Sequence, residues 1–546
     1  MVTIKRFDSA LWPVLFVLSL VPGWLLPNHY PPWTTFHLDA WIAGVLALAA
    51  LVLIWHTSAP VSVHGVTLMV SALALLPGIQ YRSGQLATAG NAWVCTAYLL
   101  GLALALMTGA RWESVRAGHL ADCLFGAIGV AAIISVGLQF HQWLTLDGLD
   151  LWSMGASFLR PHANFGQPNQ LASFLLWGLL ALGWGVLRGK IGLIVALFAA
   201  VYLLFGIALT SSRTSWVGLA IIVLAVWHWR GLWPARSLPL LVCGLALVFC
   251  MMVGFMPTIN RVLLLTGETG GIDNLARLGH ESRPQIWALF VDAALQKPWF
   301  GYGWNQVALA QMEVADQRPA LHIFFAHSHN LFLDLMLWCG IPLGLLVSGF
   351  GLAWVWRRFR HVATAEAAVL LLFLVVMANH AMLELPLHHA YVLLPFGLVM
   401  GALDQRLGIA PIMQLPRAFA MLLWVTAFVL LSLIVRDYMR VERSYQALRF
   451  EWARIKSPPA EIPDVLLLSQ WRDFVGFVKQ EPAKGLDEAE LESLRRIAAL
   501  NPGAATLQKL AVVLALNGRS DEAALWLRRM CNTAPKSQCE LVRKAW

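Results

Sequence analysis

Long apolar stretches, rather than alternating apolar and polar residues, dominate the chain up to residue 436. As a helix, each stretch of about 15–25 apolar residues crosses a hydrocarbon core of roughly 30 Å. The pattern predicts an all-α polytopic membrane protein with about 13 transmembrane helices. We place these spans near residues 10–27, 38–55, 64–78, 91–109, 119–140, 170–187, 191–210, 215–229, 237–256, 329–356, 364–381, 390–403 and 417–436.

The composition agrees with this prediction. Hydrophobic residues make up 59% of the 546 residues and charged residues 13%, whereas soluble domains carry about 25% charged residues. The 26 tryptophans are typical of a protein with many helix ends at membrane interfaces. The N-terminal apolar segment lacks a small-residue cleavage site, and further spans follow it at once, so we interpret it as the first span.

The positive charges predict the orientation. If the N-terminus lies inside, the short outer gaps hold only Arg82, Arg160 and Arg213. Because lysine and arginine gather in cytoplasmic loops, this asymmetry places residues 257–328 and everything after 437 on the outer face. It also explains the net charge of +9 without a nucleic-acid partner. The residues predicted to be inside are Lys5, Arg6, Arg111, Arg116, Arg188, Lys190, Arg230, Arg236, Arg357, Arg358, Arg360, Arg406 and Arg417.

Two long segments interrupt or follow the spans. The first, 257–328, contains a predicted amphipathic helix from Arg283 to Gln296 and a turn, "KPWFGYGWN", and we expect an ordered cap on the membrane surface. The second, 437–546, is charged, and two short helices are predicted around "NGRSD", as a helical hairpin or half of a tetratricopeptide-like repeat. We therefore divide the chain into a transmembrane domain, 1–436, and a small helical domain, 437–546.

Five of the seven cysteines fall in predicted spans, and Cys531 and Cys539 lie in the tail. If the tail faces an oxidising compartment, these two residues are expected to form a disulfide.

Polar residues from five separated segments share the predicted outer face. Arginine binds phosphate oxygens bidentately, and histidine titrates near neutral pH, so it suits a general base. Such a set at the lipid boundary suits transfer of a group from a lipid diphosphate, which is the leaving group. The residues are Arg82, Arg160, His162, Asn164, Gln167, Asn169, Arg213, Arg283, His327, Ser328, His329, Asn330, His380, Glu384, His388 and His389.

Simpler interpretations exist for several of them. Ser328 or Asn330 fits a helix N-cap, although a cap does not explain two histidines. "GQPNQ" fits a turn that opens a helix, and "LHHAYV" fits an ordinary membrane interface. His327 and His329 could bind a metal, but their spacing puts both on one face only in extended structure. The chain has no DxD, HExxH or paired-cysteine motif, so we expect neither a metal nor a cofactor.

Several of these segments occur in a characteristic order: "RPHANFGQPNQLASFL", "SSRTSW", "ESRPQIW", "KPWFGYGWNQ", "AHSHNLFLDLMLWCGIPLGLL" and "ELPLHHAYVLLP". As an ordered set they resemble the O-antigen ligase and polymerase superfamily, and within it the bacterial O-linked protein oligosaccharyltransferases. The resemblance covers most of residues 150–450, and the helical tail is also typical of the protein-directed branch.

The resemblance implies a multi-spanning, C-class, inverting glycosyltransferase of the bacterial inner membrane. It implies transfer of a preassembled glycan from undecaprenyl diphosphate to a Ser or Thr hydroxyl of a periplasmic protein such as a pilin. It further implies that neither a nucleotide sugar nor a metal is needed, and that the active site and the C-terminus are periplasmic.

The resemblance also implies residue roles. His329, followed by Asn330, takes the place of the catalytic base, and Arg213 and Arg283 hold the diphosphate. The expected substrate-binding residues are Arg82, Arg160, Gln167, Asn169, His327, Asn330, Glu384 and His389.

Other functions remain open at this point. Within the superfamily the alternatives are a ligase that acts on lipid A core and an O-antigen polymerase. A transporter should show internal repeats and polar groups near mid-membrane, whereas the polar groups here cluster at one end of the spans. A membrane scaffold would leave the interfacial arginines and histidines without a task.

Overall fold

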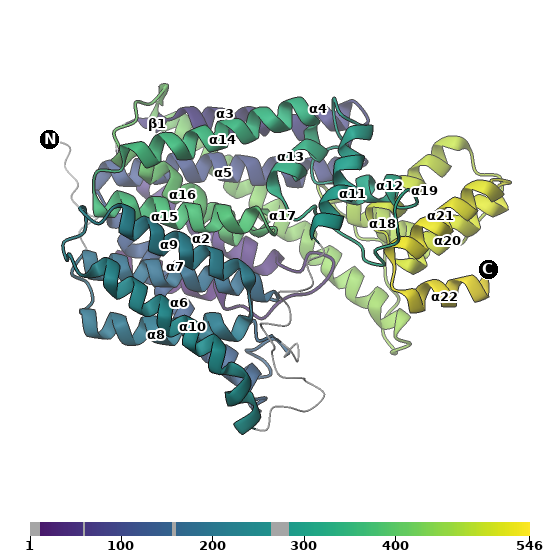
Figure 1. The fold of residues 1–546 in the computed structure, drawn as a ribbon. Coiled ribbons are helices and arrows are strands. Elements are labelled where there is room, and N and C mark those ends of the chain that lie inside the picture. The colour runs from purple at the N-terminus through teal and green to yellow at the C-terminus, as the bar shows by residue number, and fades with distance from the viewer. Residues whose placement is uncertain (1–10, 58–59, 156–159, 264–282) are drawn as a thin grey trace. The chain divides into compact units, whose positions relative to one another are not determined.

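The computed structural model describes residues 11–57, 60–155, 160–263 and 283–546. Lys5 and Arg6 and the 264–282 part of the large predicted loop lie outside the described residues. The described chain is mostly helical, as predicted, and its one sheet pairs β1 (Val61–Val63) with β2 (Met413–Leu415) in antiparallel register (Figure 1).

Every predicted span contains a helix. Among the described residues, seven helices are long and apolar enough to cross a membrane, and the predicted count of about 13 spans stays a prediction. The helices up to residue 262 are α1 (Leu11–Leu20), η1 (Val21–Trp24), α2 (Phe36–His56), α3 (Gly65–Leu73), α4 (Leu76–Arg82), α5 (Ala89–Val115), α6 (His119–Trp143), α7 (Pro168–Leu187), α8 (Leu193–Thr210), α9 (Arg213–His228) and α10 (Leu238–Val262).

The helices that follow residue 282 include α11, which confirms the predicted helix from Arg283 to Gln296. They are α11 (Arg283–Gln296), α12 (Val307–Val314), α13 (Leu331–Cys339), α14 (Ile341–His361), α15 (Ala365–Ala381), η3 (Pro386–His388), α16 (Ala390–Arg406), α17 (Arg417–Trp452), α18 (Ser469–Lys479), α19 (Glu488–Leu500), α20 (Ala504–Leu516), α21 (Ser520–Thr533) and α22 (Lys536–Ala545).

The chain forms two compact units. Unit 1 contains residues 1–70, 101–281 and 353–431, and unit 2 contains residues 71–100, 282–352 and 432–546. The predicted tail domain, 437–546, therefore falls within unit 2, together with most of the described part of the large loop. The domain boundary at 436 stays a prediction.

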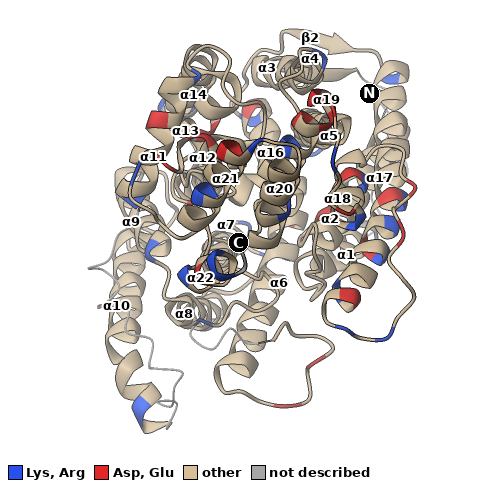
Figure 2. Cartoon of the chain, turned by 90° about the vertical axis from the view of Figure 1, so that its right-hand side faces the viewer, with Lys and Arg blue, Asp and Glu red and all other residues tan. Residues whose placement is uncertain are grey.

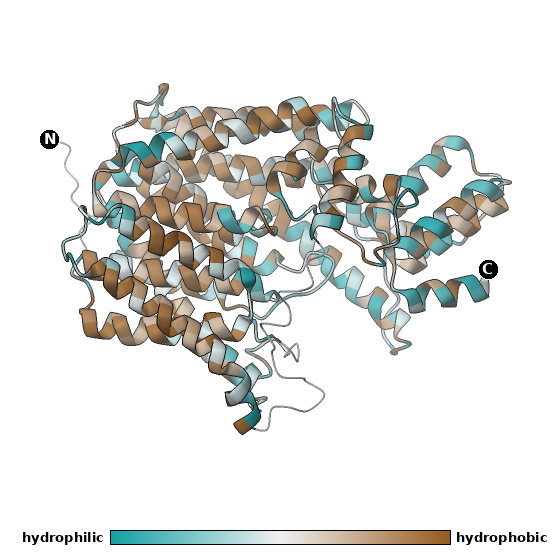
Figure 3. Cartoon of the chain, in the orientation of Figure 1, coloured by the Kyte–Doolittle hydropathy of each residue, from teal (hydrophilic) through white to brown (hydrophobic). Residues whose placement is uncertain are grey.

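The core of unit 1 is built around α7, which packs against α6, α8, α9 and α15. These helices are hydrophobic over most of their length (Figure 3). Close approach of helices depends on small residues. A Cβ atom on Gly109 of α5 would collide with the Leu398 carbonyl of α16, and one on Gly401 of α16 would collide with the Leu106 carbonyl of α5. The two backbones are thus in direct contact.

Ion pairs close one end of unit 1. Arg188, at the end of α7, binds Asp122 at 3.2 Å and Glu366 at 2.8 Å. Arg406, at the end of α16, binds Glu113 at 2.6 Å and also contacts Glu366. Arg188 and Arg406 belong to the arginines predicted to lie inside. They lie in different gaps between spans, and both contact Glu366, so these gaps meet at one end of unit 1.

A further ion pair of unit 1 is buried. The Arg358 guanidinium donates to the fully buried Asp404 carboxylate at 2.7 Å, and the Trp354 indole donates to the same carboxylate at 3.3 Å. Two donors to one buried carboxylate offset the cost of removing its charge from water.

Unit 2 has two adjoining hydrophobic clusters. α11, α12 and α13 enclose Ile286, Phe290, Val307 and Leu337, and the tail helices α19 to α22 enclose a second cluster to which Met312 of α12 also belongs. α20 and α21 lie side by side as the hairpin predicted around "NGRSD" (Figure 1). Charged residues are frequent on α17 and α18, whereas α10 of unit 1 has few (Figure 2).

The predicted span 329–356 is not one helix, because Gly340 separates α13 from α14. Gly340 has φ 85°, in the left-handed region that favours glycine. The "KPWFGYGWN" turn supplies hydrogen bonds at this break: Ile341 N donates to Pro298 O at 2.7 Å, and Tyr302 N donates to Leu337 O at 2.6 Å. The motif therefore fixes the geometry of a helix break.

The tail contains a disulfide between Cys531 in α21 and Cys539 in α22. It joins the last turn of one short helix to the next helix of unit 2.

The break at Gly340 generates a first prediction. A Cβ atom on Gly340 would collide with the Trp299 carbonyl oxygen, whereas one on Gly349 in α14 meets open space. Gly340→Ala should lower the free energy of unfolding by about 2–4 kcal/mol, because it adds both a collision and a left-handed alanine. Gly349→Ala is the matched control and should stay within about 1 kcal/mol of the parent. Thermal unfolding of the purified variants measures this, and equal shifts for both would contradict the account.

Candidate functional site

In unit 1, three predicted substrate-binding residues form one hydrogen-bonded chain. The Arg160 Nε donates to the Thr210 carbonyl at 2.7 Å, and its Nη2 donates to Asn169 Oδ1 at 3.0 Å. The Asn169 Nδ2 then donates to Glu384 Oε1 at 3.1 Å. Residues that are 224 positions apart in the sequence, Arg160 and Glu384, are therefore linked through one amide.

Several hydrogen bonds hold the "RPHANFGQPNQ" loop that carries Arg160 and Asn169. The fully buried Asn164 donates to Leu25 O at 2.6 Å and Trp152 O at 2.7 Å, and its Oδ1 accepts from Met154 N at 2.9 Å. Gln167 is the N-cap of α7 and accepts from Gln170 N. The helix entry that the simpler interpretation of "GQPNQ" predicted is therefore present, and Gln167 caps it.

Arg213 is the first residue of α9. It follows Ser211, which has φ 51°, and the N-cap residue Ser212. Thr210, which accepts the Arg160 bond, lies three residues earlier, so Arg213 lies at the same end of unit 1 as the Arg160 chain. The Arg188 ion pairs lie at the C-terminal end of α7, whereas Asn169 of the Arg160 chain lies in its first turn. The two predicted sets of polar gaps therefore separate to opposite ends of unit 1.

His389 lies in a second network at the same end. Its Nε2 accepts from the Gln170 amide at 2.9 Å, and its Nδ1 lies 3.2 Å from Thr35 Oγ1. Thr35 donates to Asp39 Oδ2 at 2.8 Å, and the Tyr391 hydroxyl contacts Gln170 Oε1. With Nε2 accepting, Nδ1 carries the proton and donates to Thr35. His389 therefore ties α2, α7 and α16 together.

Burial controls the protonation of these histidines. Removal from water lowers the pKa of His389 from 6.5 to about 4, and the neighbouring His29 and His380 add to the effect. Burial likewise lowers the pKa of His388 to about 3. Burial also lowers the pKa of His162, and that of His29. These rings are neutral at pH 7, which suits hydrogen-bonding roles.

In unit 2, the "HSHN" segment is a tight turn before α13. Asn330 is the N-cap, and its Oδ1 accepts from Phe332 N at 3.0 Å and Leu333 N at 3.2 Å. The buried Asp334 accepts from Ser328 N at 2.8 Å. The capping interpretation of Asn330 is thus confirmed, and it leaves the two histidines without a capping task.

His329 has a left-handed backbone with φ 60°, which is uncommon for a residue other than glycine. Neighbours on both sides hold it: His329 N donates to His327 Nδ1 at 3.2 Å, and the Trp287 indole donates to His329 O at 3.4 Å. The centroids of the His327 and His329 rings are 4.0 Å apart. Because His327 Nδ1 accepts, the neutral His327 ring carries its proton on Nε2.

Trp287 also connects His329 with Arg283. Arg283 and Trp287 lie on α11, one turn apart, and α11 packs against α13. Unit 2 therefore brings Arg283 and His329 into one neighbourhood. Arg82, in contrast, is exposed at the end of α4, and the buried polar residue of its motif is Gln80, which bonds Trp338 O at 2.8 Å and Trp304 N at 2.9 Å.

Four residues of the His389 network were not predicted from the sequence: Thr35, Asp39, Gln170 and Tyr391. One signal was present, because Asp39 is a carboxylate inside an apolar span, and such residues usually have a partner or a function.

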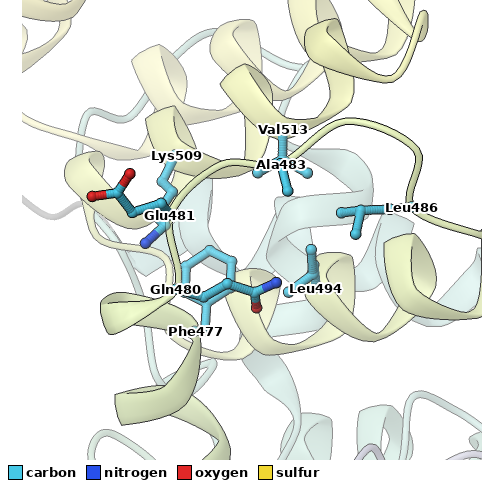
Figure 4. A pocket seen from close by; sticks show the side chains of 8 residues that line it. All are labelled: Phe477, Gln480, Glu481, Ala483, Leu486, Leu494, Lys509 and Val513. Carbon is cyan, nitrogen blue, oxygen red and sulfur yellow. The ribbon is translucent and has the colours of Figure 1, made fainter.

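A pocket in the tail contains none of the predicted residues. It is lined by Phe477, Gln480, Glu481, Ala483, Leu486, Leu494, Lys509 and Val513 (Figure 4). The Lys509 ammonium donates to Val478 O at 2.8 Å and lies 5.4 Å from the Phe477 ring centroid. The Lys509 side chain thus serves the packing of α18 on α20. The candidate site is therefore sought at the contacts of Arg160, His389 and His329, not at this pocket.

Comparison with known proteins identifies the family. The chain is 30% identical over 538 residues to a protein named General O-oligosaccharyltransferase from Acinetobacter baylyi, with 96% of this chain and 92% of that protein covered. The chain belongs to the O-oligosaccharyltransferase family. The transferase is also 30% identical over 244 residues to the ComP-specific O-oligosaccharyltransferase of the same organism, covering 44% of this chain and 43% of that protein.

Three family patterns match parts of the transferase. They are described as O-antigen ligase, over residues 198–348, protein glycosylation ligase, over 161–184, and virulence factor membrane-bound polymerase, C-terminal, over 368–545. The predicted resemblance is therefore confirmed. Together with its apolar helices, the family makes the transferase a multi-pass membrane enzyme that transfers glycosyl groups.

The lowered pKa of His389 predicts how stability depends on pH. The unfolded chain binds a proton at His389 near pH 6.5, but the folded transferase binds it only near pH 4. This contribution to stability is complete above pH 6.5 and is lost as the pH falls towards 4. The drop in unfolding temperature between pH 7 and pH 5 should therefore be smaller for His389→Gln than for the parent. Exposed His361→Gln is the control and should keep the parental drop; an unchanged drop in His389→Gln would refute the assignment.

Proposed function

We propose that the transferase moves a preassembled oligosaccharide from undecaprenyl diphosphate to Ser or Thr hydroxyls of periplasmic proteins, pilin-like proteins among them. It would act in the bacterial inner membrane, with the active site and the C-terminus on the periplasmic face. The names of the relatives support a protein acceptor. The charge asymmetry of the gaps supports the orientation.

The observation that carries the proposal is the backbone at His329. A left-handed histidine costs free energy, and such conformations persist where surrounding contacts determine them, often at functional sites. The Asn330 cap, the Ser328–Asp334 bond and the Trp287 bond to His329 O fix this turn. A general base must be held in a defined position, and these contacts support that role for the His329 ring.

The reaction follows from these groups. His329 takes the proton of the acceptor hydroxyl as the oxygen bonds to the anomeric carbon. The bond from that carbon to the diphosphate oxygen breaks on the opposite face, which inverts the configuration, and its electron pair stays on the diphosphate. Arg213 and Arg283 stabilise the developing negative charge as bidentate donors. His329 then releases its proton to water.

Other predicted residues have supporting roles in this proposal. Arg160, Asn169 and Glu384 offer donors and acceptors that suit glycan hydroxyls or the carrier. Gln167, Asn330 and His389 shape the surrounding backbone through the bonds described above. Arg82 is exposed and is proposed to contact the carrier. Guanidinium groups supply the positive charge, so transfer is proposed to be independent of metal and to continue in the presence of a chelator.

The base assignment is tested with purified transferase, a lipid-diphosphate glycan and an acceptor protein. His329→Ala should slow transfer by about 10²–10⁴-fold, because it removes a general base. The exposed His361→Ala serves as the matched control and should transfer at the parental rate. Normal transfer by a folded His329→Ala variant would remove His329 from the mechanism.

The second candidate, a ligase that acts on lipid A core or a polymerase, is favoured by the O-antigen ligase and polymerase matches. A deletion strain separates the candidates. Under our proposal, mass spectrometry should show periplasmic proteins that lose their glycan, while lipopolysaccharide keeps its normal pattern on gels. Loss of long lipopolysaccharide with unchanged protein glycans would favour the second candidate.

A further inference from the structure

The segment that leads to His329 has no regular secondary structure of its own. Residues 315–330 connect α12 to α13 by turns and irregular backbone. The polar groups of irregular backbone need partners outside the local chain. The position of His329 therefore depends on whatever holds this segment.

The tail holds its beginning and its middle. The Asn532 side-chain amide, in the last turn of α21, donates to Ala315 O at 2.9 Å, and the Asn532 carbonyl accepts from His322 N at 2.9 Å. The His322 Nδ1 lies 3.0 Å from Cys531 O. Arg529 adds an ion pair with Asp316 at 3.3 Å. One turn of α21 thus holds two points of the segment that are seven residues apart.

Gln311 of α12 holds the end of the segment. Its buried amide donates to Ile323 O at 2.9 Å and accepts from Phe325 N at 2.8 Å. The Phe325 ring then packs edge-on against His329, with ring centroids 6.0 Å apart. Continuous contacts therefore run from Asn532 to the His329 ring, all of them within unit 2.

The disulfide restrains the turn that makes these contacts. Cys531, whose carbonyl faces His322, is bonded to Cys539 of α22, eight residues later. A cross-link of this kind limits how far the last turn of α21 can unwind. The residues that hold the His329 segment therefore sit on a covalently closed end of the helix.

We propose that Asn532 is a positioning residue for glycan transfer and that the Cys531–Cys539 disulfide keeps it in place. The tail then supports the catalytic turn from within unit 2, and transfer depends on the oxidised state of the tail. This inference rests on the proposed role of His329 as the base.

The test uses full-length transferase and compares Asn532→Ala with Asn501→Ala. Asn501 also donates its amide to a backbone carbonyl, Ile497 O at 3.0 Å, but within its own helix α19. Asn532→Ala removes the side-chain bond to Ala315 O and keeps the backbone bond from His322 N. It should lower kcat about tenfold, since small displacements of a catalytic group are costly, with KM for the lipid-linked glycan unchanged. Hydrogen exchange over residues 315–330 should become faster. Asn501→Ala should change neither.

Reduction of the disulfide, or Cys531→Ser with Cys539→Ser, should lower kcat in the same direction, and reductant should have no further effect on the double variant. Parental kcat in Asn532→Ala would overturn the inference, whether or not hydrogen exchange changes. The inference would also be overturned if Asn501→Ala lowered kcat and thermal stability as much as Asn532→Ala does.

His329→Ala, assayed in the same series, separates the two ideas. Loss of transfer in His329→Ala together with normal transfer in Asn532→Ala rejects only the role of the tail. Normal transfer in His329→Ala rejects the base, and the positioning inference with it.

Discussion

The backbone hydrogen bond at an interrupted helix is the interaction on which this structure depends. In apolar surroundings an unpaired N–H or C=O costs free energy, so each helix end near the chemistry must be satisfied by another part of the chain. Gln167 does this for α7, Asn330 for α13, and the "KPWFGYGWN" turn for the break at Gly340. Three of the segments that carry the sequence resemblance therefore supply groups that complete helix ends.

The candidate chemistry is distributed according to the same logic. Unit 1 has two polar ends. Ion pairs between arginine and carboxylate side chains close one end, and at the other the Asn169 amide links Arg160 to Glu384. In unit 2 a strained histidine is fixed beside the helix that begins with Arg283. The arginine–carboxylate pairs at the first end of unit 1 suit a structural role.

Much of this arrangement was predictable from the sequence because membrane helices are encoded by simple apolar length. The helix from Arg283 to Gln296 and the hairpin around "NGRSD" were also readable from their periodicity. The break at Gly340 was not, since its partner residues, 298–302, lie about 40 positions earlier. Likewise, the network of His389, Gln170, Thr35 and Asp39 joins three distant segments, and local patterns carry no information on such long-range hydrogen bonds.

The ion pairs of unit 1 also bear on how the nascent chain matures in the bilayer. When α7 leaves the ribosome, Arg188 can meet Asp122, which was made earlier, but Glu366 is synthesised 178 residues later. The partner of Glu113, Arg406, is synthesised 293 residues after it. An unmatched carboxylate must therefore be tolerated, or shielded by water or an insertion factor, until the last helices of the unit are threaded. Biogenesis of this unit is thus completed from its C-terminal end.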